Sequence, residues 1–119
     1  MTDINTFGAV MSFAIELESK LRDYYQAAGS AEKSAASEKR RQTLERVRRE
    51  NVTEIKLEPI NDLHEETYAL NTSDTGDAGQ KAAARTAAQF YQDAAPKINV
   101  REAQRALERC GKAHAENAL

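Results

Sequence analysis

Apolar residues along this chain recur at alternating spacings of three and four, which is the period of a helix with one buried face. In the first such segment, Met11, Ala14, Leu21 and Tyr25 follow this spacing once Glu18 is included in the series. Three further segments have helical composition, and no pair of alternating strands with a hairpin turn competes with them. The pattern therefore predicts an all-α protein.

Local signals place the ends of four helices. Gly29 favours the left-handed backbone geometry that ends many helices, and Pro59 and Pro96 each stop a helix because proline lacks an N–H donor. Asn99 is suited to cap the last helix, with Glu102 three residues later completing a capping box. We expect helices at about 5–28, 31–57, 78–95 and 99–118.

The lengths of the connections predict the topology. Short turns after the first and third helices make each pair an antiparallel hairpin, whereas about 20 residues between the second and third helices are enough to cross the length of a bundle. The chain of 119 residues has the size of one domain with one core. We therefore expect a single domain, 1–119, in which two helical hairpins joined by a long crossover form an antiparallel four-helix bundle.

Composition excludes several function classes. The chain has 17 basic and 19 acidic residues, so no overall field favours nucleic acid or an anionic membrane. No apolar run approaches the roughly 18 residues of a membrane span, and the N-terminus lacks the features of a secretory signal. Cys110 is the lone cysteine, which excludes an internal disulfide and a cysteine-rich zinc site. We expect a cytoplasmic protein that neither binds nucleic acid nor inserts into a membrane.

Polar residues interrupt the predicted buried faces of the helices. A carboxylate such as Glu18 on an apolar face is costly unless a metal, a cation or hydrogen bonds compensate it, although a position at the edge of the face would let it reach water. Each other helix also has a polar group near the middle of its apolar face. These residues form a predicted core polar cluster of Glu18, Tyr25, Arg48, Asn51, Tyr91 and His114.

Two stretches resemble a known family. Residues 14–18 (AIELE), followed by Tyr24 and Tyr25, and residues 107–116 (LERCGKAHAE) are similar to the rubrerythrin-type branch of the ferritin-like superfamily. Members with an active centre have one glutamate on each of helices one and three, and an ExxH motif on each of helices two and four. Those residues hold two iron ions, whose positive charge the clustered carboxylates balance. The resemblance implies a ferritin-like bundle.

This chain departs from the family pattern at most ligand positions. Glu18 matches the glutamate of helix one, and His114 matches the histidine of helix four. The other four positions, now vestigial, hold Arg48, Asn51, Ala84 and Gly111. A guanidinium repels a metal ion at close range, so the resemblance implies a degenerate site with no metal and no cofactor. We expect Arg48 to pair with Glu18 in place of the metal.

Three other features have alternative interpretations. The basic run on the second helix is either a solvated face or a docking surface for an acidic protein or RNA, and no aromatic residue for base stacking lies within it. Cys110 and His114 lie on one helix face. They either pack in the core or form a pair that acts as a nucleophile or binds a metal. His64 is expected to be a surface histidine. The basic run consists of Lys39, Arg40, Arg41, Arg46, Arg48 and Arg49.

Two functions follow as expectations. The first is a non-catalytic interaction protein, an accessory subunit of a larger complex or a homo-oligomer, since a thin alanine-rich core gains stability by burying a further face. The second is a residual metal-binding or redox protein of the rubrerythrin and ferritin type, in which Glu18, His114 and Tyr25 supply ligands, with Cys110 or a second chain of a dimer as a further source.

Overall fold

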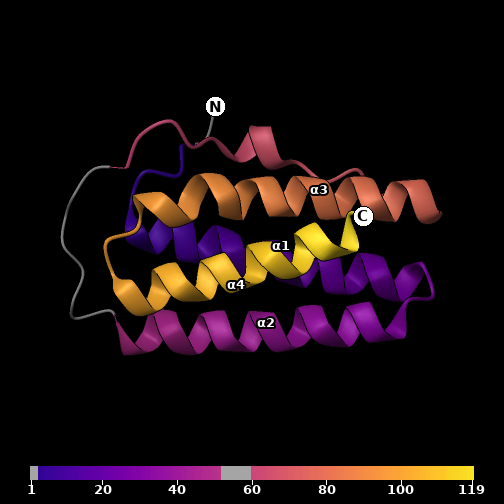
Figure 1. Ribbon diagram of the computed structural model, residues 1–119, viewed down its shortest axis with the longest axis horizontal. Helices are drawn as coiled ribbons and strands as arrows, with labels where there is room; N and C mark the ends of the chain where they lie inside the picture. The colour runs from indigo at the N-terminus through magenta and orange to yellow at the C-terminus, as the bar shows by residue number, and fades with distance from the viewer. Residues whose placement is uncertain (1–2, 52–59) are drawn as a thin grey trace.

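Four long helices pack side by side in the computed structural model, which describes residues 3–51 and 60–119 (Figure 1). The described residues contain no strand, only an isolated antiparallel bridge between Asp3 and His64. The prediction of an all-α protein is confirmed. The long helices are α1 (Phe7–Ala27), α2 (Ala31–Glu50), α3 (Asp77–Ala94) and α4 (Arg101–Asn117), and the short 3-10 helices are η2 (Glu65–Tyr68) and η3 (Ala95–Lys97).

The ends of α1 and α2 follow from local chemistry. The Thr6 hydroxyl accepts a hydrogen bond of 3.0 Å from the amide of Ala9 and so caps α1. Gly29 has a φ of +80°, the geometry that lets the chain turn into α2 without a steric cost. The structure describes α2 as far as Glu50, and the predicted continuation to residue 57 with its stop at Pro59 lies outside the described residues.

The predicted cap of the last helix is wrong. Val100 and not Asn99 occupies the N-cap position of α4, and no side chain caps this end. The Glu102 carboxylate, expected to complete a capping box, accepts a hydrogen bond of 2.8 Å from the Asn51 side-chain amide instead. This contact joins the start of α4 to the end of α2, so a tertiary interaction has replaced a local one.

The helices run in two directions. In Figure 1, α1 and α4 run from left to right, and α2 and α3 run from right to left. Segment 60–76 lies along α1: the amide of Ile4 donates to the Leu63 carbonyl at 2.9 Å before the start of the helix, and the Tyr24 hydroxyl donates to the Asp74 carbonyl at 2.5 Å near its end. This segment therefore brings the chain to α3 at the end of the bundle where α1 finishes.

Aromatic packing fixes the described part of this connection to the bundle. Tyr68 of η2 lies against Phe13 of α1 and Phe90 of α3, with ring centroids 6.2 Å and 5.3 Å apart. The Tyr68 hydroxyl donates to Asp93 at 2.6 Å. Leu63 and Tyr68 are both buried, so segment 60–76 contributes to the core and is more than a surface loop.

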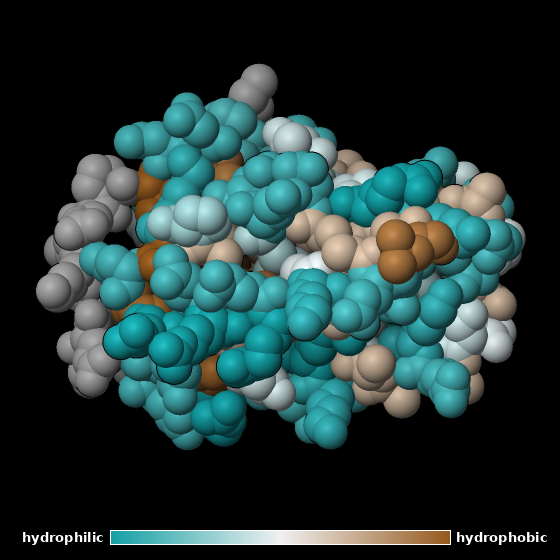
Figure 2. All heavy atoms as spheres, in the orientation of Figure 1, coloured by the Kyte–Doolittle hydropathy of each residue, from teal (hydrophilic) through white to brown (hydrophobic). Residues whose placement is uncertain are grey.

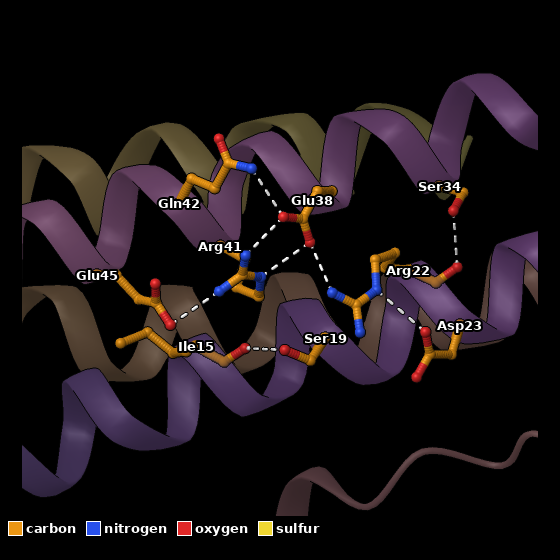
Figure 3. A network of polar contacts seen from close by, with 9 residues as sticks. All are labelled: Ile15, Ser19, Arg22, Asp23, Ser34, Glu38, Arg41, Gln42 and Glu45. Atoms are coloured by element: carbon orange, nitrogen blue, oxygen red, sulfur yellow. Dashed lines mark hydrogen bonds and ion pairs between the residues drawn. The ribbon is translucent and has the colours of Figure 1, made fainter.

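Charged residues reinforce the α1–α2 hairpin. Apolar packing contributes little there, since α2 buries only four residues between its ends. The Glu38 carboxylate accepts hydrogen bonds from Arg41 and Gln42 of its own helix and from Arg22 of α1 (Figure 3). Hydrogen bonds from Arg41, Arg22 and Gln42 lower the pKa of Glu38 well below its usual range. The Ser34 hydroxyl also donates to the Arg22 carbonyl, at 2.9 Å. This polar network holds a helix with little apolar surface against α1.

Close approach of α3 and α4 depends on Gly111. A Cβ atom at Gly111 would lie 2.8 Å from Cβ of Tyr91, so even alanine would push the two helices apart. We expect Gly111→Ala to lower the free energy of unfolding by about 1–3 kcal/mol, the range for overpacking, measured by urea denaturation. Gly8→Ala is the control, because a Cβ at Gly8 meets nothing within 4 Å. It should stabilise α1 by up to about 1 kcal/mol, and equal losses in both variants would contradict the packing argument.

Candidate functional site

The buried carboxylate of Glu18 lies at the centre of the bundle. Its side chain has no exposed surface, and the apolar residues Ala14, Leu17 and Leu21 on the same face of α1 are also buried. The helical period that buries these neighbours leaves Glu18 no route to water. The alternative of a position at the solvent edge is therefore wrong, and the carboxylate needs partners inside the protein.

One side chain from each of the other three long helices meets Glu18. The Tyr91 hydroxyl of α3 donates to Oε2 at 2.5 Å, and Nε2 of His114 in α4 lies 2.7 Å from the same oxygen. Arg40 of α2 donates its Nε–H to Oε1 at 3.0 Å. We call these four residues the Glu18 cluster. It joins both hairpins through one carboxylate.

The cluster keeps Glu18 ionised. Burial by itself raises the pKa of the carboxyl group, but the hydrogen bond and charge of His114, the charge of Arg40 and the hydrogen bond from Tyr91 outweigh it and lower the pKa. Burial and the adjacent Glu18 charge raise the pKa of Tyr91 well above its usual value. Tyr91 is thus a hydrogen-bond donor to an anion, and the Arg40 guanidinium balances the negative charge.

The predicted cation in this cluster was the wrong one. Arg48 is exposed, and Arg40 takes its place. Glu18 precedes Gly29 by eleven residues and Arg40 follows it by eleven, so the antiparallel hairpin puts them side by side. Arg48 lies about 12 Å further along the helix axis, at a rise of about 1.5 Å per residue. The equal distance of Glu18 and Arg40 from the turn at Gly29 is the signal in the sequence that could have identified Arg40.

Two other predicted members of the core cluster make no hydrogen bond to Glu18 in the described structure. Asn51 is buried, but its amide donates to the Val47 carbonyl and to Glu102 near the start of α4. Tyr25 is fully buried, and its hydroxyl has no hydrogen-bond partner among the described residues. Burial raises the pKa of Tyr25. Of the six predicted residues, the structure brings together Glu18, Tyr91 and His114.

The ligand positions expected from the family resemblance do not fit a pair of iron ions. Arg40 already contacts the Glu18 carboxylate, and a cation there repels a metal ion. Ala84 is buried without a donor atom, and a glutamate at Gly111 would require α3 and α4 to separate. Residues 3–51 and 60–119 contain no group of three or more histidine, cysteine or acidic side chains that could hold a metal ion. A single carboxylate and one imidazole are too few donors for the charge of two irons.

The remaining candidate residues do not form a reactive group. Cys110 is 5% exposed, and burial followed by the nearby Glu18 charge raises the pKa of its thiol to about 12. A thiol that stays protonated is a weak nucleophile, so packing is the role that its surroundings favour. Nδ1 of His64 lies 2.7 Å from the Asp3 carboxylate beside the N-terminal bridge. That contact gives this half-buried histidine a structural partner.

Comparison with known proteins places the chain in no family. No protein-family model, no curated protein and no solved structure matches it. The described helices also include none with the length and apolarity needed to cross a membrane.

Arg40 and Arg48 give a direct test of which arginine balances Glu18. Arg40→Gln should lower the free energy of unfolding by about 3–5 kcal/mol, because it leaves a buried carboxylate without its cation. Arg48→Gln removes the same charge from an exposed position and should change it by less than about 0.5 kcal/mol. Urea denaturation at pH 7 measures both. Equal effects would show that the Arg40 pair adds nothing to stability.

The lowered pKa of Glu18 predicts how stability depends on pH. Its ionised form contributes fully above the ordinary glutamate pKa of 4.5, and this contribution falls as the pH drops through the lower pKa of the folded state. Glu18→Gln should therefore cost about 3 kcal/mol at pH 7, and its deficit relative to wild type should shrink below pH 4.5.

Glu16→Gln is the matched control for this measurement, because Glu16 lies on the same helix and is 62% exposed beside Lys20. Its deficit should stay within about 1 kcal/mol at every pH. A Glu18→Gln deficit that does not change between pH 7 and pH 3 would refute ionisation of Glu18 as the source of the stability.

Proposed function

We propose that this protein is a non-catalytic ferritin-like bundle that acts as an interaction subunit, within a larger complex or a homo-oligomer. The contact between Arg40 and Glu18, at 3.0 Å, is the observation that carries this proposal. A cation of the chain balances the one carboxylate that the family resemblance assigns to iron. The Glu18 carboxylate then has a structural role in the core, and we look for function at the surface.

The arrangement of the helices supports the ferritin-like part of the proposal. Ferritin-like bundles consist of two antiparallel hairpins joined by one long crossover connection. Here α1 and α2 form one hairpin, α3 and α4 form the other, and segment 60–76 runs along α1 toward the start of α3 (Figure 1). α2 and α3 point the same way, as a crossover of this kind requires.

Burial argues against catalysis at the Glu18 cluster. Glu18 and His114 have no exposed surface, and Tyr91 is 1% exposed. Both Glu18 oxygens already accept hydrogen bonds from the protein, so a substrate would have to displace a partner to reach them. The alternative of residual metal or redox chemistry needs donors that the cluster lacks, and no contact in the described residues favours it.

A shallow hollow between α3 and α4 is the surface best suited to a protein partner. Its volume is about 350 Å³, and Glu108 and Lys112 supply its charged lining. Figure 2 shows apolar residues gathering on this face near the C-terminal end of α4, and Leu119 there is 89% exposed. Apolar surface with a polar rim is typical of protein interfaces. The uncharged lining residues are Ala88, Tyr91, Gln92, Ala95, Pro96, Gly111 and Ala115.

A charge introduced into this hollow tests the proposal. Ala115→Glu places a carboxylate in it, whereas Ala82→Glu makes the same change at an exposed position of α3 outside its lining. We expect light scattering or affinity purification to find the wild type in a complex larger than the 13.2 kDa chain. Ala115→Glu should weaken that complex at least tenfold, and Ala82→Glu less than twofold.

Two results would count against the proposal. A wild-type protein that has the mass of one chain at every concentration, and retains no partner, would contradict the interaction function itself. A complex that both variants form equally well would contradict the assignment of its interface to the α3–α4 hollow. Circular dichroism of each variant confirms that the bundle is intact.

A further inference from the structure

A second hollow, between α2 and α4, has a different chemical character. Its volume is about 230 Å³, and Lys39, Arg40 and Arg109 line it together with Thr43. Two alanines and the buried Cys110 make up the rest of the lining. No carboxylate lines this hollow, although the chain as a whole carries more acidic than basic residues. We call it the basic hollow.

Two of its three cations have no partner. Lys39 and Arg109 are exposed and make no ion pair with any described residue. By contrast, Arg41 and Arg46 on the same helix pair with glutamates of α2. Arg40 is balanced by Glu18 behind it. The hollow therefore presents two uncompensated positive charges, and such a concave surface attracts anions.

Arg40 is held in a fixed position at this surface. Its Nε–H donates to Glu18 and its Nη2 donates to the Ser37 hydroxyl at 3.1 Å, which leaves Nη1 without a hydrogen-bond partner among the described residues. The side chain is 15% exposed. A guanidinium ordered in advance loses little side-chain entropy when it binds an oxyanion, and planar N–H groups suit phosphate oxygens.

We propose that the basic hollow binds a small oxyanion of the phosphate class, as free phosphate or as a phosphate monoester. Its volume is smaller than the 300–1,000 Å³ typical of pockets for drug-sized ligands, and it leaves room for a phosphate group. The two unpaired cations match a dianion. This inference is independent of the proposed function, because the basic hollow and the α3–α4 hollow have no lining residue in common.

Titration with inorganic phosphate, followed by amide chemical shifts in NMR at constant ionic strength, tests this proposal. We expect saturable shifts within residues 39–43 and 106–113 and a millimolar dissociation constant. The double variant Lys39→Gln with Arg109→Gln should weaken binding at least tenfold and keeps Arg40 on Glu18. Phosphoserine in a parallel titration distinguishes the sources: binding of the ester supports a phosphate monoester, and binding of inorganic phosphate alone supports the free ion.

The control variant removes two charges elsewhere. Arg85 of α3 and Lys97 of η3 are exposed and lie outside the basic hollow, so the double variant Arg85→Gln with Lys97→Gln has the same net charge as the test variant. Its affinity should stay within twofold of wild type. Non-saturable shifts in the wild type, or equal weakening in both double variants, would overturn the proposal, because either result means general screening without a site.

Discussion

An ionised carboxylate buried at the centre of a helical bundle constrains every element around it. Removing such a charge from water costs several kcal/mol unless a counter-charge and hydrogen bonds replace the lost solvation. Here the replacements come from three different helices, as Arg40, Tyr91 and His114. The four helices must therefore have the rotation and position that bring these three partners to the Glu18 carboxylate. Alanine side chains are small and similar, so an alanine-rich interior does not by itself define one arrangement of the helices. The hydrogen bonds of the Glu18 cluster favour one arrangement over the others.

The same cluster also borders the two proposed binding surfaces, because Tyr91 lines the α3–α4 hollow and Arg40 lines the basic hollow. The Glu18 carboxylate itself has no exposed surface, and both of its oxygens already accept hydrogen bonds within the protein. Both proposed binding surfaces are hollows between helices. Their linings differ: small uncharged residues form most of one, and cations line the other. α4 lines both of them.

Periodicity and turn chemistry were sufficient to predict the four helices and the turn at Gly29. They also identified Glu18, Tyr91 and His114, because polar residues on an apolar face are visible in a sequence. The Arg40 partner was missed since α2 is charged on several faces, and its apolar pattern, with Leu44 and Val47 as the buried positions, is too sparse to define one face. The cap at Asn99 failed because a contact between distant residues, Asn51 and Glu102, replaced a local one. Distant contacts of this kind leave no local signal.

The length of the α1–α2 hairpin determines which side chains meet in the interior. Glu18 and Arg40 are equally distant from Gly29 in the sequence. The number of residues between Glu18 and Arg40 therefore places the guanidinium opposite the carboxylate. An insertion of one residue in the first turns of α2 would rotate Arg40 by about 100° around the helix axis and carry its guanidinium off the inner face. Loop length at an exposed turn is usually free to vary. In this bundle the segment between residues 18 and 40 has a fixed length, because its length determines whether the Arg40 guanidinium reaches the buried Glu18 carboxylate.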